Sequence, residues 1–139
     1  MKEIKNQKGA AAVEFAIVFP LLLVLVFGII EFSIMLYNKA MITNASREGA
    51  RTGIVFAMPR VSDTVITSVI DSYCSNSLIS FGDQNQPVVT ISRSGSGAEA
   101  GDILTVSVSY HYDYLVLPNL IESLISGMDL TATTVMRME

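Results

Sequence analysis

The longest apolar run of the chain lies near its start. Residues 10–30 contain one charged side chain, Glu14, and one proline, Pro20. A helix rises about 1.5 Å per residue, so a run of this length covers a bilayer core about 30 Å thick. Membrane helices tolerate proline where neighbouring helices satisfy the freed backbone groups. We therefore expect one transmembrane segment over residues 10–31, and its last residue is a second acid, Glu31.

The helical pattern continues past the apolar run, because residues 32–57 contain no proline. A narrow stripe of small residues recurs there at every fourth position, formed by Met41, Ala45, Gly49, Gly53 and Ala57. Glycine costs a helix about 1 kcal/mol relative to alanine, so two of them indicate a packing contact. The surroundings are polar, so we expect the stripe to pack on a sheet or second helix of its own subunit, with a contact between subunits as the alternative. Pro59 should end the helix near Met58.

A second helix is predicted after Pro59, from residue 63 to about Leu78. Ser62 is a suitable N-cap, and Asp63 is favourable at the positive end of a helix. One apolar face recurs at helical spacing and consists of Val65, Ile66, Val69, Ile70 and Tyr73.

The period then changes to two, which is typical of strands. We expect strands over residues 88–93, 103–114 and 129–138, with a flexible loop at 94–101 and a short helix at 118–126. In the middle strand one face is apolar and should be buried, formed by Leu104, Val106, Val108, Tyr110 and Tyr112, and the other face is polar. The predicted fold is therefore α+β: a long N-terminal transmembrane helix continuing as a spine, a second helix and a three-stranded antiparallel sheet.

Composition argues against several classes of function. The net charge is −4, and no run of Lys or Arg follows residue 60, so nucleic-acid binding through a basic surface is not expected. One cysteine, Cys74, and one histidine, His111, provide neither an internal disulfide nor a structural zinc site. We expect Cys74 to be a buried thiol and His111 to lie on the polar face of its strand. Without a nucleophile motif, paired carboxylates or a metal cluster, we expect no enzyme activity and no cofactor.

The first nine residues, MKEIKNQKG, are basic and end at Gly9. They resemble the leader of type IV pilin-like proteins, which a prepilin peptidase removes after glycine and which precedes a helix with glutamate as its fifth residue. The stretches GAAAVEFAIVFP, GIIEF and NASREGAR follow in order and resemble the TadE-like family of the tight-adherence (Flp) pilus system. The likeness covers roughly residues 8–53, with Ser46 standing where an alanine is common.

The resemblance implies a minor pilin or pseudopilin with a pilin-like fold. Cleavage after Gly9 would make Ala10 the new N-terminus and Glu14 the fifth residue, whose carboxylate would meet the free amine of a neighbouring subunit during assembly. Glu31 would either mark the outer membrane boundary or bind a partner subunit. The implied partners are a prepilin peptidase, other pilins or pseudopilins, and inner-membrane pilus assembly proteins.

Three regions follow from these expectations: a leader (1–9), a transmembrane segment (10–31) and an extracytoplasmic domain (32–139). The positive charges on the two sides of the transmembrane segment are equal in number, so they do not decide its orientation. We place the N-terminus in the cytoplasm because the short leader is the easier piece to leave there. We expect a single-pass protein of the inner membrane with its C-terminal domain in the periplasm or outside the cell. The alternative is a membrane-tethered binding module, an adhesin or a periplasmic sensor, that joins no filament.

Overall fold

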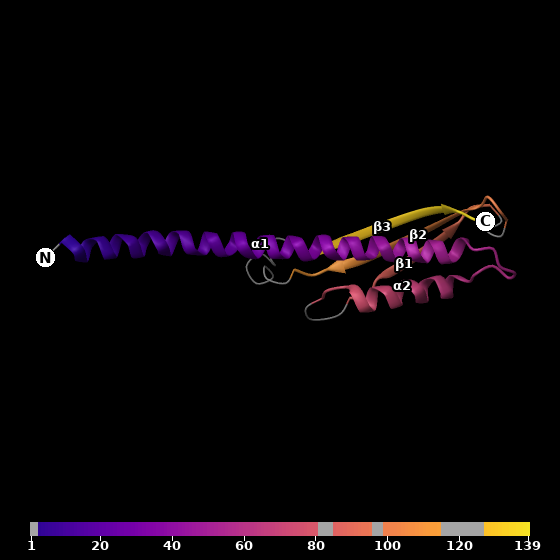
Figure 1. Ribbon diagram of the computed structural model, residues 1–139, viewed down its shortest axis with the longest axis horizontal. Coiled ribbons are helices and arrows are strands. Elements are labelled where there is room, and N and C mark those ends of the chain that lie inside the picture. The colour runs from indigo at the N-terminus through magenta and orange to yellow at the C-terminus, as the bar shows by residue number, and fades with distance from the viewer. Residues whose placement is uncertain (1–2, 81–84, 96–98, 115–126) are drawn as a thin grey trace. The chain divides into compact units, whose positions relative to one another are not determined.

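The computed structural model describes residues 3–80, 85–95, 99–114 and 127–139, and for residues 3–8 the backbone only. The elements are α1 (Glu3–Ile54), α2 (Asp63–Ser77), β1 (Val88–Arg93), β2 (Ile103–Tyr112) and β3 (Met128–Arg137) (Figure 1). The strands form one antiparallel sheet in the order β1-β2-β3. The predicted α+β class is confirmed. The short helix expected at 118–126 lies outside the described residues.

Helix α1 begins at Glu3 and runs through Gly9, because the cost of one glycine, about 1 kcal/mol, does not outweigh the good helix formers around it. Its C-terminal end differs from the prediction. It ends at Ile54 rather than near Met58. The Ile54 carbonyl accepts the Glu139 amide at 3.2 Å and the Val55 carbonyl accepts from the Arg60 side chain at 3.3 Å, so the end is satisfied without a further turn.

Helix α2 begins where the sequence indicated, with Ser62 as its N-cap. The Ser62 side chain makes no capping bond, and its backbone carbonyl accepts the amides of Val65 and Ile66 instead. The buried face is centred on Ile66, Ile70 and Cys74. The placing of Val65 on that face is wrong, since this residue is 46% exposed. A single step along a helix turns about 100°, which carries Val65 off the line through Ile66 and Ile70.

The sheet confirms the alternation seen in the sequence. Its buried side holds the five predicted residues of β2, namely Leu104, Val106, Val108, Tyr110 and Tyr112. The outer side carries hydroxyls that pair across strands: Ser107 with Thr133 at 3.0 Å and Ser109 with Thr131 at 3.3 Å. Strand β2 ends at Tyr112, two residues earlier than predicted, and the half-buried Tyr114 ring meets Tyr112 edge-on at 6.0 Å.

The described chain divides into two compact units, Met1–Ser33 and Ile34–Glu139. In the second unit, the part of α1 from Ile34 onward packs beside the sheet and α2. The Lys39 ammonium donates to the Thr131 carbonyl, and the hydroxyls of Ser46 and Thr134 hydrogen-bond at 2.7 Å. Residue numbers increase together along both elements, so β3 runs in the same direction as this part of α1.

Asn38 on α1 holds the chain that leaves α2. Its side-chain amide donates to the Ile79 carbonyl at 2.8 Å and accepts the Ile79 amide at 2.9 Å. Asn38 itself is fully buried. The amide oxygen and nitrogen of Asn38 thus replace the backbone partners that Ile79 lacks outside a helix or strand.

Candidate functional site

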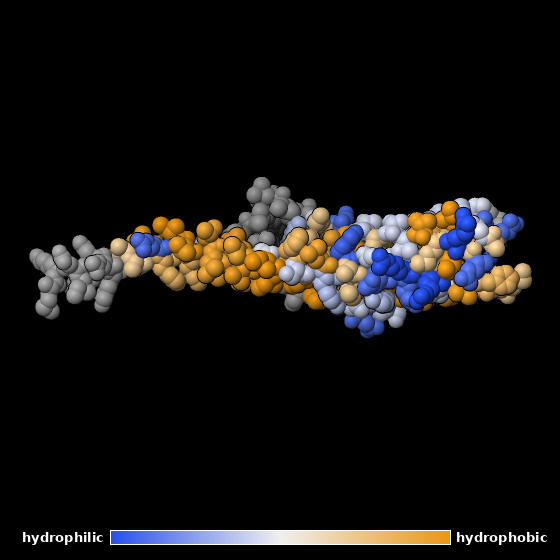
Figure 2. All heavy atoms as spheres, turned by 45° about the horizontal axis from the view of Figure 1, so that its top comes forward, coloured by the Kyte–Doolittle hydropathy of each residue, from blue (hydrophilic) through white to orange (hydrophobic). Residues whose placement is uncertain are grey.

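The apolar surface of α1 identifies the first candidate site. From Gly9, α1 is long and apolar enough to cross a membrane, with a mean hydropathy of 2.8 and no part of that window buried. Large apolar side chains such as Phe15 (64%) and Ile17 (70%) are exposed there. Figure 2 shows a mostly hydrophobic surface along this part of the chain. The helix continues through Pro20. Such a helix fits a membrane anchor, and a bilayer would remove this apolar surface from water.

The three residues expected at the processing and assembly site lie on the first turns of this surface. Gly9, Ala10 and Glu14 are all exposed, and a Cβ placed on Gly9 would meet no atom within 4 Å. Ala10 and Glu14 are four positions apart and therefore share one face of the helix. The carboxylate is thus flanked by apolar side chains, among them Phe15, which stacks on Phe19 with ring centroids 5.2 Å apart.

Glu31 differs from its neighbours, because it is only 4% exposed. It is one of three buried polar residues in the described chain, with Asn38 and Ser46. Glu31 is not without a partner, since it takes part in at least one interaction with another residue. An ionised carboxylate that is this buried requires such partners, because its desolvation costs several kcal/mol.

The small-residue stripe of α1 faces the interior of the second unit. Ala45, Gly49 and Gly53 are buried. A Cβ on Gly49 would lie 2.6 Å from Ile70 of α2, and one on Gly53 would lie 2.5 Å from Leu104 of β2. The two glycines therefore let the α1 backbone approach α2 and the sheet within the subunit. One helix thus presents large apolar side chains outward before residue 31 and small ones inward after residue 42.

Comparison with known proteins gives one match. The model of the TadE-like protein family matches residues 9–51. This segment of the chain is TadE-like. The match confirms the resemblance seen in the sequence, and it covers the apolar surface and most of the small-residue stripe. No curated protein and no solved structure matches the chain.

The match describes the apolar, membrane-anchor part of the chain and the helix that follows it, and no more of the 139 residues. The match stops at residue 51, so the sheet and α2 lie outside it. Within the described residues, no group of three or more His, Cys, Asp or Glu side chains is arranged to hold a metal ion.

A charged cluster that the sequence did not reveal lies at one end of the sheet. His111 is on the polar face, as predicted, and its Nδ1 lies 2.6 Å from the Asp129 carboxylate. Asp113 is 3.4 Å from the His111 Nε2, and it also accepts the Asn85 amide at 2.7 Å. Pairing His111 with Asp129 required the strand register, which alternation alone does not supply.

The histidine makes stability depend on pH. The hydrogen bond to Asp129 is the largest of the effects that raise the pKa of His111. A histidine pKa that is higher in the folded than in the unfolded protein stabilises the folded state. This contribution is complete at pH values below the unfolded pKa, about 6.5, and it is lost as the pH rises through the folded pKa. We expect the urea midpoint to fall over that window. In the Asp129→Asn variant the urea midpoint should fall less with pH, whereas in Asp71→Asn it should fall as in the wild type. An equal fall in both variants would contradict the role of the His111–Asp129 pair.

Proposed function

We propose that this protein is a minor pilin or pseudopilin of a tight-adherence-type pilus. A prepilin peptidase cuts it between Gly9 and Ala10, and the apolar part of α1 then holds it in the inner membrane until it joins or primes a filament. The observation that carries the proposal is the coincidence of the TadE-like match, the exposed apolar helix and one carboxylate, Glu14, five positions after Gly9.

Cleavage would change the electrostatics of the helix start. It removes Lys2, Lys5 and Lys8 and creates an ammonium group on Ala10. A carboxylate in hydrocarbon costs several kcal/mol unless it is paired, so Glu14 requires a cation once the leader is gone. A neighbouring subunit that has also been cut supplies one at its own N-terminus. Assembly would thereby be limited to processed chains.

The first test is the position of the N-terminus. We expect the full chain co-expressed with a prepilin peptidase to yield a mature protein that begins Ala-Ala-Ala-Val-Glu, measured by intact mass and N-terminal sequencing. Gly9→Leu should block the cut, because leaders of this kind are cut after a glycine; within the chain itself a side chain at this position would meet no atom. Gly28→Leu, which also adds a side chain in open space, should be cut normally. A chain that still begins at Met1 beside an active peptidase contradicts processing.

The second test separates insertion from assembly. Glu14→Leu should leave membrane insertion intact, since it removes the only charge of the apolar run. Incorporation into the pilus fraction should fall about a hundredfold, because removing one partner of a buried ion pair costs about 3 kcal/mol or more. The measurement is the ratio of pilus-bound to membrane-bound protein, and Glu48→Leu on the exposed side of α1 is the control. Normal incorporation of the Glu14 variant would exclude this role and favour a membrane-tethered module.

A further inference from the structure

Strand β1 lies at one edge of the sheet, next to β2 (Figure 1). Continued by one residue, its register with β2 places Ser94 opposite Ile103, and the Ser94 amide donates to the Ile103 carbonyl at 2.9 Å. In an antiparallel pair, residues whose backbone groups bond the partner strand alternate with residues whose groups point away from it. The residues of β1 whose N–H and C=O groups point away from β2 are therefore Val89, Ile91 and Arg93.

The other side of β2 gives the same assignment. The Met138 amide donates to the Asp102 carbonyl at 2.7 Å, in line with the register of β2 with β3. The even-numbered residues of β2 therefore bond β3, and the odd-numbered residues bond β1. Their partners on β1 are Val88, Thr90 and Ser92. Among the described residues, no backbone partner lies opposite the three outward residues, and we call this row the free edge of β1.

The two edges of the sheet differ in their protection. At the outer edge of β3, the Lys39 ammonium donates to the Thr131 carbonyl, and a lysine at an edge opposes the addition of another strand. At the free edge, the Arg93 guanidinium is held by α2 and the residues before it. It pairs with Asp63 and donates to the Val61 carbonyl at 3.1 Å. The free edge of β1 therefore has no cation lying across its backbone within the described residues.

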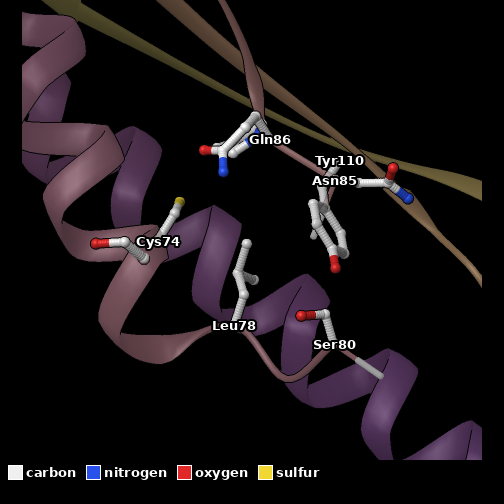
Figure 3. Close-up of a pocket in the computed structure, with 8 residues that line it drawn as sticks. Cys74, Leu78, Ser80, Asn85, Gln86 and Tyr110 are labelled. Carbon is white, nitrogen blue, oxygen red and sulfur yellow. The ribbon is translucent and has the colours of Figure 1, made fainter. Parts of the chain in front are cut away.

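The start of β1 is held in place. The Asn85 side-chain amide donates to the His111 carbonyl at 3.0 Å and to Asp113 at 2.7 Å. Figure 3 shows Asn85 next to Tyr110 of β2, at a small pocket that the end of α2 also lines. An edge that is already fixed as a strand does not have to be ordered when a partner binds.

The inner face beside the free edge is incompletely covered. Val89 and Ile91 pack against the core but remain partly exposed. Their partners on β2, Val108 and Val106, are fully buried. Paired residues of antiparallel strands share a face, so an added strand with apolar residues opposite Val89 and Ile91 would complete this cover. Its alternate residues would lie on the outer face, beside the exposed Thr90.

We propose that the free edge of β1 binds an extended segment of another protein, which adds to the sheet as a fourth strand. The outward residues offer three N–H donors and three C=O acceptors. Successive outward residues are about 7 Å apart, and an extended backbone presents matching groups at that spacing. The segment alternates apolar with hydroxyl-bearing side chains. The free edge lies beyond the TadE-like match and stands apart from the proposed pilus role.

A second copy of this chain is disfavoured as the occupant by direction. Each strand is antiparallel to the next and β3 follows α1 from Ile34 onward, so β1 also runs in the direction of this part of α1. Antiparallel pairing of β1 with the β1 of another copy would place the two α1 helices in opposite directions. Two copies anchored in one membrane through α1 run these helices in the same direction, so the symmetric pairing does not fit them.

Amide hydrogen exchange of the full chain in micelles tests the free edge itself. In the protein alone, the Val89 and Ile91 amides should exchange about a hundredfold faster than the Thr90 amide, which bonds β2. Equal protection of Ile91 and Thr90 would show that the edge is already covered and would overturn the proposal. Protection that grows with protein concentration would assign the edge to a second copy and would overturn it as well.

A capped peptide, Lys-Thr-Val-Thr-Val-Thr-Lys, is the probe for the occupant. We expect it to shift the NMR signals of the Val89 and Ile91 amides along a saturating curve and to slow their exchange. The same peptide N-methylated at both valines keeps the side chains but lacks the donors that face β1, so it should bind about tenfold more weakly or less. No saturating shift with the first peptide, or equal binding of the two, would refute strand addition.

Proline variants test the same edge from the protein. Val89→Pro removes one outward donor and none of the bonds to β2, so the urea midpoint should stay near the wild-type value while peptide binding weakens about tenfold. Val135→Pro makes the same change at the outer edge of β3 and should bind the peptide normally. Thr90→Pro removes a donor to β2 and should lower the urea midpoint. Wild-type binding by Val89→Pro, or equal destabilisation by Val89→Pro and Thr90→Pro, would contradict the proposal.

Discussion

Gly53→Leu is expected to destabilise the second unit by about 3 kcal/mol, at the upper end of the cost of overpacking a core. The Cβ alone would lie 2.5 Å from the Leu104 side chain and 2.7 Å from Ile66, so the longer side chain has no space between α1, α2 and β2. Domains of this kind are stable by only about 5–15 kcal/mol in total. Urea unfolding in micelles, followed by the near-ultraviolet circular dichroism of the buried tyrosines, measures the loss.

The same helix contains its own control. A Cβ on Gly28 would meet no atom within 4 Å, so Gly28→Leu should leave the urea midpoint of the second unit unchanged. The urea midpoint of Gly53→Ala should lie between those of Gly53→Leu and the wild type, because its steric cost is offset by about 1 kcal/mol of improved helix propensity. If Gly53→Leu unfolded at the wild-type urea concentration, the close approach at this glycine would be refuted.

Asn38→Leu is expected to cost about 2–6 kcal/mol. The substitution removes both hydrogen bonds to Ile79 and leaves its amide and carbonyl unsatisfied in a part-buried place, at about 1–3 kcal/mol for each group. Leucine has as many side-chain non-hydrogen atoms as asparagine, so the substitution leaves no cavity. The measurement is again the urea midpoint, together with hydrogen exchange at the Ile79 amide, which should accelerate more than its neighbours.

Two further variants define the role of Asn38. Asn38→Asp keeps an acceptor for the Ile79 amide but loses the donor and buries a charge, so it should also destabilise. Asn76→Leu removes an exposed side-chain bond to Ser72 on α2, and its effect should stay within about 0.5 kcal/mol. Equal stability of the Asn38 and Asn76 variants would show that the clamp does not hold the chain after α2.

The sequence predicts the elements of this protein better than the contacts between them. A period of two in β2 identifies the buried face because strand geometry alone sets it, and the glycines of α1 indicate a close contact because each has a helix cost. The contact of Asn38 joins residues 41 positions apart, and the pairing of His111 with Asp129 depends on register. Neither contact leaves a pattern in the local sequence, so both could be found only in the three-dimensional structure.

The candidate sites divide in the same way. Glu14 was found because a charge within an apolar run is costly wherever the run is placed. The free edge of β1 was missed because alternation predicts a strand without showing which neighbours it pairs with, and the outward residues follow only from the register. The exposure of Val65 shows the limit of helical periodicity, which locates a face to within about one residue.

The direction of β3 has a consequence for synthesis on the ribosome. The strands pair with sequence neighbours and form early, but the bond between Ser46 and Thr134 closes a separation of 88 residues, and the core also contains Met138. Translation proceeds at about 5–20 residues per second. The face of α1 that carries Ser46 therefore stays without its β3 partner for several seconds after it leaves the ribosome, and a chaperone or membrane insertase has that interval in which to bind it.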